Sequence, residues 1–398
     1  MIRYPAYDPP EYVNWQADAA VLAEYSDTLE RDAHRREIIR ALEPAKHLAI
    51  YAGLLRNRLH DIALKRWVMQ GVISKAWLGT GEEATTIGVV HALNRASEHQ
   101  AHDFVAPMIR NAGACHEMGM PLADMLRGYL GTADSPTRGR DLHIGDFRHG
   151  VIAPVSPVGD IIAVTTGIAL SFKLNREPRI AVTWIGDGST KSGVFHEAMN
   201  FCAVQRLPMI VIIQNNQVAL GTRLEQHHRS DFAQWHEAYG VPGLTFDGNN
   251  VLDAYAAAKI AVDGCRSGEG PFLLVSETFR MGGHATHDER EARHTFDAKL
   301  FEHWGKRDPI GLYENYLLEG TLDLESGRRL RRTNAMRERN EAILRQVEAQ
   351  VLKEIEQSEQ DALASVKTQK PVPESAREGV YRETPKESGR KFKTVASD

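Results

Sequence analysis

Two apolar, strand-like segments joined through a single helix constrain the fold of this chain most strongly. The first covers Ile180–Ile185 and the second covers Met209–Ile213, and both are rich in β-branched residues. Residues 193–206 between them favour one apolar face, as an amphipathic helix does. We therefore predict a βαβ unit, whose two strands run parallel and end at the same edge of a sheet.

Short polar motifs follow both of these strands. Asp187 lies in a Gly-Asp-Gly sequence after the first strand, and Asn216 ends an Asn-Asn pair after the second. Each motif alone is typical of an ordinary turn. If the strands are neighbours, however, a carboxylate and an amide oxygen meet about 5 Å apart, and Mg²⁺ prefers such oxygen ligands together with phosphate groups. A helix N-terminus beside them favours an anion. Together the motifs predict a metal–diphosphate site.

The spacing of the two motifs distinguishes this site from other nucleotide sites. No G-x-G-x-x-G sequence opens the intervening helix, and no Walker sequence is present, so generic dinucleotide or nucleotide binding is disfavoured. A Gly-Asp-Gly sequence followed after about thirty residues by Asn-Asn resembles the thiamine diphosphate motif.

From about Leu48 to Leu318 the chain resembles the alpha subunit of the decarboxylating component of 2-oxoacid dehydrogenase complexes. That family includes the pyruvate, branched-chain 2-oxoacid and acetoin dehydrogenases. Besides the two metal motifs, the matching blocks are Gly79–Glu83, Ile109–Gly113, Leu142–Ile144, Ser156–Val158 and Arg280–His284 followed by Asp288. The Ser-Pro-Val block is closer to the branched-chain type than to the pyruvate type.

The expected fold is α/β, with a doubly wound, mostly parallel sheet of the thiamine diphosphate-binding type and helical N- and C-terminal extensions. Strand and helix patterns alternate from about Thr85 to Thr278, as such a sheet requires. Further strands are expected near residues 103–105, 244–246 and 272–277, and a buried helix over 161–174. The predicted domains are an N-terminal arm and helix (1–47), the diphosphate-binding domain (48–320), a helical extension (321–366) and a polar tail (367–398).

The resemblance implies roles for residues on the metal and diphosphate side. Mg²⁺ is expected on Asp187, Asn216 and the backbone carbonyl of Val218, where the family usually has Tyr. Four further groups are expected to bind the cofactor diphosphate or support an anion there: the backbone of Gly188 and Ser189 and the side chains of Arg110 and Arg280. His284 is expected to contact both the diphosphate and the substrate, and to act as the catalytic proton donor. A His-x-x-His zinc site at residues 284–287 is the weaker alternative.

The resemblance also assigns the pyrimidine side and shows departures from the family. Ser156 and Val158 are expected beside the aminopyrimidine. Gln214 stands where some relatives have an Arg that touches the cofactor, and it is expected to contact the cofactor through a weaker, neutral hydrogen bond. Ile109 replaces a Tyr. Asp160 and the residue after it replace a Thr-Gln pair, so no potassium site is predicted. Ala285 stands where mammalian relatives carry a phosphorylated Ser.

The chain carries no evident second, pyrimidine-binding domain, so we expect it to form half of an active site. In the family a separate beta subunit supplies the catalytic Glu, which predicts an alpha2beta2 assembly. The implied reaction is oxidative decarboxylation of a small 2-oxoacid with acyl transfer to lipoyl groups of an acyltransferase core. Two alternatives remain: an acetoin dehydrogenase-type alpha subunit, and a non-catalytic regulatory subunit that keeps the fold.

Composition excludes several other classes. The net charge of −5 gives no electrostatic case for nucleic-acid binding. The most apolar window, residues 161–174, is too short to span a membrane, and residues 1–8 do not resemble a signal peptide. Three cysteines without metal or redox spacing are typical of reduced thiols, so we expect a cytoplasmic protein.

Overall fold

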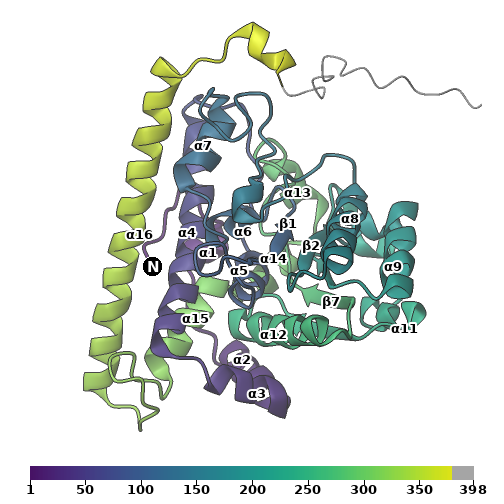
Figure 1. Ribbon diagram of the computed structural model, residues 1–398. Coiled ribbons are helices and arrows are strands. Elements are labelled where there is room, and N and C mark those ends of the chain that lie inside the picture. Colours follow the sequence, from purple (N-terminus) through teal and green to yellow (C-terminus); the bar gives the residue numbers. More distant parts are fainter. Residues whose placement is uncertain (379–398) are drawn as a thin grey trace, which may run out of the picture.

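The computed structural model describes residues 1–378, and Figure 1 shows the arrangement of its elements. At the centre is a five-stranded sheet of order β1-β2-β3-β7-β6 in which every pair is parallel. Its strands are β1 Phe104–Ala106, β2 Ala181–Gly186, β3 Met209–Asn215, β6 Gly243–Asp247 and β7 Phe272–Glu277. The predicted strands are confirmed to within one or two residues at each end.

Helices cover both faces of the sheet, because successive residues of a strand point to opposite faces. In β3, Ile210 and Ile212 join the core beneath α12, whereas Val211 and Ile213 join the core that contains Phe195 of α9. The first face is covered by α4 Pro44–Met69, α5 Glu83–His91 and α12 Val251–Ser267, and the second by α8 Asp160–Asn175, α9 Gly193–Gln205 and α11 Trp235–Tyr239. The predicted α/β, doubly wound fold is therefore confirmed.

Shorter elements surround this body. The segments that connect the central strands along the chain contain three short helices, α6 Ala112–Glu117, α7 Leu122–Leu130 and α10 Leu224–His227. They also contain the hairpin strands β4 Val218–Ala219 and β5 Thr222–Arg223, and the 3-10 helices η1 Phe147–His149, η2 Gly188–Lys191 and η3 Phe232–Gln234. The terminal regions contribute α1 Pro10–Val13, α2 Ala19–Arg31, α3 Ala33–Arg40, α13 Glu289–Thr295, α14 Ala298–Gly305, α15 Pro309–Glu319, α16 Asn334–Thr368 and η4 Pro373–Arg377.

The N-terminal segment packs on the body of its own chain through a buried arginine. Arg58 of α4 donates to Asp308 at 3.0 Å and to Glu83, and its guanidinium lies 4.8 Å from the ring centroid of Tyr12. Asp8 pairs with the same guanidinium at 3.4 Å. A buried charge is tolerated only when it is paired in this way, so Arg58 joins the N-terminus, the body and the start of α15.

The C-terminal helix α16 begins at Asn334, later than residue 321, where the predicted helical extension begins. Thr333 caps it by accepting a hydrogen bond from the Met336 backbone N–H at 3.2 Å. The helix then runs along α4 and α7 (Figure 1). Most of the predicted polar tail lies outside the described residues. In the part of the chain that is described, no helix is both long and apolar enough to cross a membrane.

Candidate functional site

The site lies at the carboxyl ends of β2 and β3, where the sequence predicts it. Asp187 follows β2 directly and Asn216 follows β3, and the register pairs Gly186 with Gln214. Neighbouring strands lie about 4.7–4.9 Å apart, so the two side chains share one edge of the sheet. Both are about 1% exposed. The crevice outside the carboxyl ends of parallel strands is the usual ligand site of such sheets.

The carboxylate of Asp187 is only half satisfied. Its Oδ1 accepts a hydrogen bond from the Gly188 backbone N–H at 2.8 Å, whereas Oδ2 has no hydrogen-bond partner within residues 1–378. Burial raises the pKa of Asp187 above its ordinary value. A buried carboxylate oxygen without a partner is costly, and a divalent cation would satisfy it. The residue therefore fits the predicted metal ligand.

Asn216 presents its amide oxygen because its amide nitrogen is already used. Its Nδ2 donates to Glu82 Oε1 at 2.7 Å, while its Oδ1 accepts only a long bond from the Val218 backbone N–H at 3.3 Å. The orientation of an amide is set by such partners. The Asn216 oxygen thus remains available as a second oxygen ligand. No group of three or more His, Cys, Asp or Glu side chains in the described chain could hold a metal.

Glu82 is a site residue that the sequence reasoning missed. It lies just before α5, is buried, and accepts hydrogen bonds from Asn216, from Gln214 Nε2 and, at 3.3 Å, from Arg110 Nε. It lies in the block Gly79–Glu83, which resembles the family, but nothing local in the sequence indicates that a carboxylate at this position would reach β3. Gln214 is fully buried, accepts from Asn111 at 3.0 Å, and so lies within this network.

The β4–β5 hairpin lies against the turn that follows Asp187. A Cβ added at Gly188 would lie 2.6 Å from the Cβ of Ala219, so a larger residue at 188 would displace the hairpin. Val218 begins this hairpin and is buried. The backbone carbonyl of Val218, which is expected to bind the metal, is therefore held close to the turn that follows Asp187.

A cavity of about 490 Å³ opens beside this edge. Five of the predicted cofactor residues, from four segments of the chain, line it: Arg110, Ser156, Val158, Ser189 and His284. Ser156 Oγ lies 3.1 Å from Nε2 of His143, which lines the same cavity, as does Trp77. Val158 is 66% exposed, so the cavity is open on the side where Val158 lies.

Arg110, Arg280 and His284 lie around the cavity and its edge. Burial, followed by the positive charges of Arg110 and Arg280, lowers the pKa of His284 to about 4. Burial, followed by Arg110, lowers the pKa of Arg280 to about 10. Arg280 donates to the carbonyls of Gly282 at 3.2 Å and Leu220 at 2.9 Å, so it ties the His284 loop to the hairpin. An anion placed among these groups would relieve their repulsion and favour a protonated His284.

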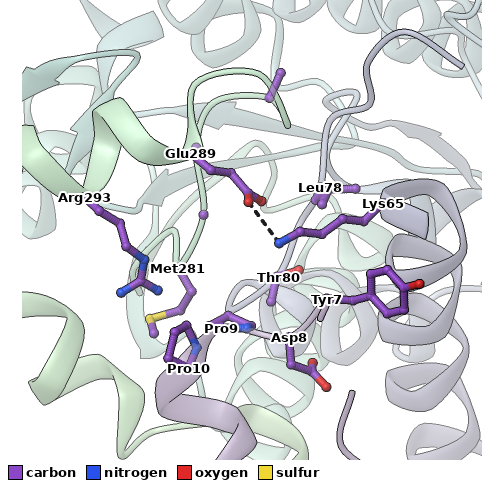
Figure 2. Close-up of a pocket in the computed structure, with 13 residues that line it drawn as sticks. Tyr7, Asp8, Pro9, Pro10, Lys65, Leu78, Thr80, Met281, Glu289 and Arg293 are labelled. Carbon is purple, nitrogen blue, oxygen red and sulfur yellow. Dashed lines mark ion pairs between the residues drawn. The ribbon is translucent and has the colours of Figure 1, made fainter. Parts of the chain in front are cut away.

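The loop that carries His284 is fixed from behind. The Asp288 carboxylate accepts from the backbone N–H groups of His284 at 3.1 Å and Ala285 at 2.8 Å. A second, smaller cavity of about 70 Å³ lies behind the loop, and Figure 2 shows Lys65 reaching across it to Glu289, an ion pair of 2.9 Å. These contacts join the loop to α4 and α13, so His284 is positioned by both.

Comparisons with known proteins agree with this geometry. The family model for the dehydrogenase E1 component matches residues 53–367. The alpha subunit of acetoin:2,6-dichlorophenolindophenol oxidoreductase from Bacillus subtilis (strain 168) is 31% identical over 285 residues, which cover 71% of this chain and 83% of that protein. The 2-oxoisovalerate dehydrogenase subunit alpha of the same organism is 32% identical over 246 residues, or 61% of this chain and 72% of that protein.

A third relative is the 3-methyl-2-oxobutanoate dehydrogenase subunit alpha of Mycobacterium tuberculosis (strain CDC 1551 / Oshkosh). It is 32% identical over 275 residues, which cover 69% of this chain and 71% of that protein. Residues 53–367, which the family model matches, include Asp187, Asn216 and the whole sheet, and the comparisons confirm the resemblance found in the motifs. The chain therefore belongs to the dehydrogenase E1 component family.

Proposed function

We propose that this chain is the alpha subunit of a 2-oxoacid dehydrogenase component that uses thiamine diphosphate and Mg²⁺. The reaction is oxidative decarboxylation of a small 2-oxoacid, with transfer of the acyl group to a lipoyl group of an acyltransferase core. The observation that carries the proposal is the free, buried Oδ2 of Asp187 beside the available amide oxygen of Asn216. Family membership implies thiamine diphosphate, and these oxygens suit a metal bound to its phosphates.

The residues divide into those that hold the cofactor and those that handle protons. Asp187, Asn216 and the Val218 carbonyl would hold Mg²⁺, while Gly188 and Ser189 would offer backbone N–H groups to the diphosphate. When bound, thiamine diphosphate supplies the electron sink for loss of carbon dioxide.

Residues on the other side of the cavity would bind the phosphates, orient the pyrimidine and donate a proton at the reacting centre. Arg110 would bind phosphate oxygens through its guanidinium, and Arg280 would hold the nearby loop and hairpin. Ser156 and Val158 would orient the pyrimidine. His284 would donate a proton at the reacting centre once an anion raises its pKa from about 4.

A beta subunit would complete the site. The cavity opens beside the exposed Val158, and Val155 and Val164 nearby are also exposed, so an apolar partner surface fits there. We propose an alpha2beta2 assembly in which the partner contributes the carboxylate that contacts the pyrimidine. The three free cysteines are all buried thiols, which supports a cytoplasmic location.

Titration calorimetry tests the proposal directly. The chain, with its beta partner, should bind thiamine diphosphate when Mg²⁺ is present and lose this binding in EDTA, and Asp187→Ala should abolish it. Unchanged affinity of the Asp187→Ala variant would refute the metal assignment.

An acetoin-type subunit is the second candidate, favoured by the 31% identical Bacillus relative. A panel of pyruvate, branched 2-oxoacids and acetoin, with 2,6-dichlorophenolindophenol as electron acceptor, separates these readings. A cofactor-binding assembly that turns over none of them would indicate the regulatory alternative.

A further inference from the structure

We propose that His227 is a further hydrogen-bond donor to the diphosphate of the cofactor, which deepens the proposed function and rests on it. His227 is the last residue of α10, and its Nε2 lies 3.8 Å from the free Oδ2 of Asp187. Its side chain is 13% exposed, and neither ring nitrogen has a hydrogen-bond partner in the described chain. A shielded imidazole nitrogen, Nε2, therefore lies close to a shielded carboxylate oxygen.

The distance between these groups indicates a shared third partner. A separation of 3.8 Å is too long for a hydrogen bond, which requires about 2.7–3.2 Å between nitrogen and oxygen. Leaving both partners buried and unbonded costs free energy in each of them. An oxygen-rich anion with its metal would satisfy both at once, with the cation on Asp187 and an anionic oxygen on His227.

The chain path brings His227 to this position together with a predicted metal ligand. The segment that starts at Val218 continues through β5 into α10, and α10 packs against the η2 turn that begins at Gly188. The backbone N–H of Arg223 donates to Gln226 Oε1 at 2.8 Å and so fixes the start of α10. The Val218 carbonyl and the His227 imidazole are therefore carried on one folded segment beside the same turn.

Two other nearby side-chain donors, Gln214 and Arg280, are already engaged. The Gln214 amide donates to Glu82, and Arg280 donates to the carbonyls of Gly282 and Leu220. A neutral imidazole retains one N–H donor, so His227 can donate a hydrogen bond to the ligand that Gln214 and Arg280 do not donate. Mg²⁺ prefers oxygen to nitrogen ligands, which favours a bond to the diphosphate over direct coordination of the metal.

Calorimetric titrations with thiamine diphosphate and with inorganic pyrophosphate, both with Mg²⁺, test this role in the assembled protein. We expect His227→Ala to lower the affinity for both ligands by about 10-fold, the effect of losing one hydrogen bond to a charged group. His227→Gln, which retains an N–H donor, should recover affinity to within about 3-fold of the unmodified protein. The matched control is His228→Ala, because the adjacent ring stacks on Phe232 at 3.7 Å instead, and its affinity should stay within about 2-fold.

Three results would overturn the inference. The first is unchanged affinity of His227→Ala, and the second is an equal loss in His228→Ala, which would indicate a loop effect. The third is a directly bonded nitrogen in the electron spin resonance of the Mn²⁺-loaded protein, which would make His227 a metal ligand. Failure of the unmodified protein to bind either ligand would instead refute the proposed function itself.

Discussion

Replacing Asp187 with Asn should stabilise the ligand-free protein and abolish metal-dependent cofactor binding. The free Oδ2 is buried without a partner in residues 1–378, and burial raises the pKa of the carboxyl. Asn has nearly the same shape and its Oδ1 can still accept from the Gly188 N–H, but it carries no charge. Removing the uncompensated buried charge should be worth about 1–3 kcal/mol, because the neutral Nδ2 that replaces Oδ2 costs less to leave unpaired than a carboxylate oxygen does. At about 2.1 cal/mol/K per residue of unfolding entropy, the melting temperature should rise by about 1–4 °C.

The pH dependence of this effect has a defined sign. A carboxyl whose pKa is raised by folding binds more protons in the folded state, so stability falls as pH rises through that pKa. The gain from Asp187→Asn should therefore be present at pH 7 and should shrink in acid, where Asp187 becomes protonated. Thermal unfolding in EDTA at several pH values measures the gain, and the same scan with Mg²⁺ and thiamine diphosphate measures the loss of ligand stabilisation. A variant less stable than the unmodified protein in EDTA at pH 7 would refute the reasoning.

Three further variants test the surrounding network. Glu82→Gln should weaken Mg²⁺-dependent cofactor binding about 10-fold, because Asn216 loses the charged acceptor that orients its amide; equal calorimetric affinities would remove Glu82 from the site. Arg58→Met leaves buried carboxylates without their cation and should cost about 3–5 kcal/mol in denaturant unfolding, whereas the 75% exposed Arg345→Met should cost under about 0.5 kcal/mol. Burial lowers the pKa of His47 to about 4, so between pH 6.5 and 4 acid should remove up to about 3 kcal/mol of stability; a His47→Phe variant with the same acid sensitivity would contradict this.

The parts of the fold that the sequence predicts well are those with strong local patterns. The apolar runs at Ile180–Ile185 and Met209–Ile213 form adjacent parallel strands because each is buried on both faces. Asp187 and Asn216 could be located because a residue just after a strand must lie at the end of the sheet. The start of α16 was less predictable, since residues 323–333 carry the same charged character as the helix but form a loop closed by the Leu322–Arg329 bridge.

The residues that complete the site could not be predicted in the same way. Glu82 reaches Asn216 only because α5 packs beneath the sheet, and His227 reaches Asp187 only because the hairpin folds back over η2. Both contacts join residues far apart in the sequence, and neither residue type carries a local signature of its role. For Gln214 the resemblance predicts a contact with the cofactor, and the structure adds what the sequence does not show, that its side chain also accepts from Asn111 and donates to Glu82.

The two buried carboxylates of the site differ in a way that itself locates the ligand. Glu82 accepts from three side chains, so its charge is compensated before any ligand binds. Asp187, at the end of the strand that pairs with β3, has one oxygen with no partner among residues 1–378. A protein that could pair one buried carboxylate so fully would have no structural reason to leave its neighbour half paired. The incomplete pairing is explained if the two carboxylates have different roles. Glu82 would hold the amide of Asn216 in the orientation that the ion requires, and Asp187 would bind the ion itself and so contribute the binding free energy.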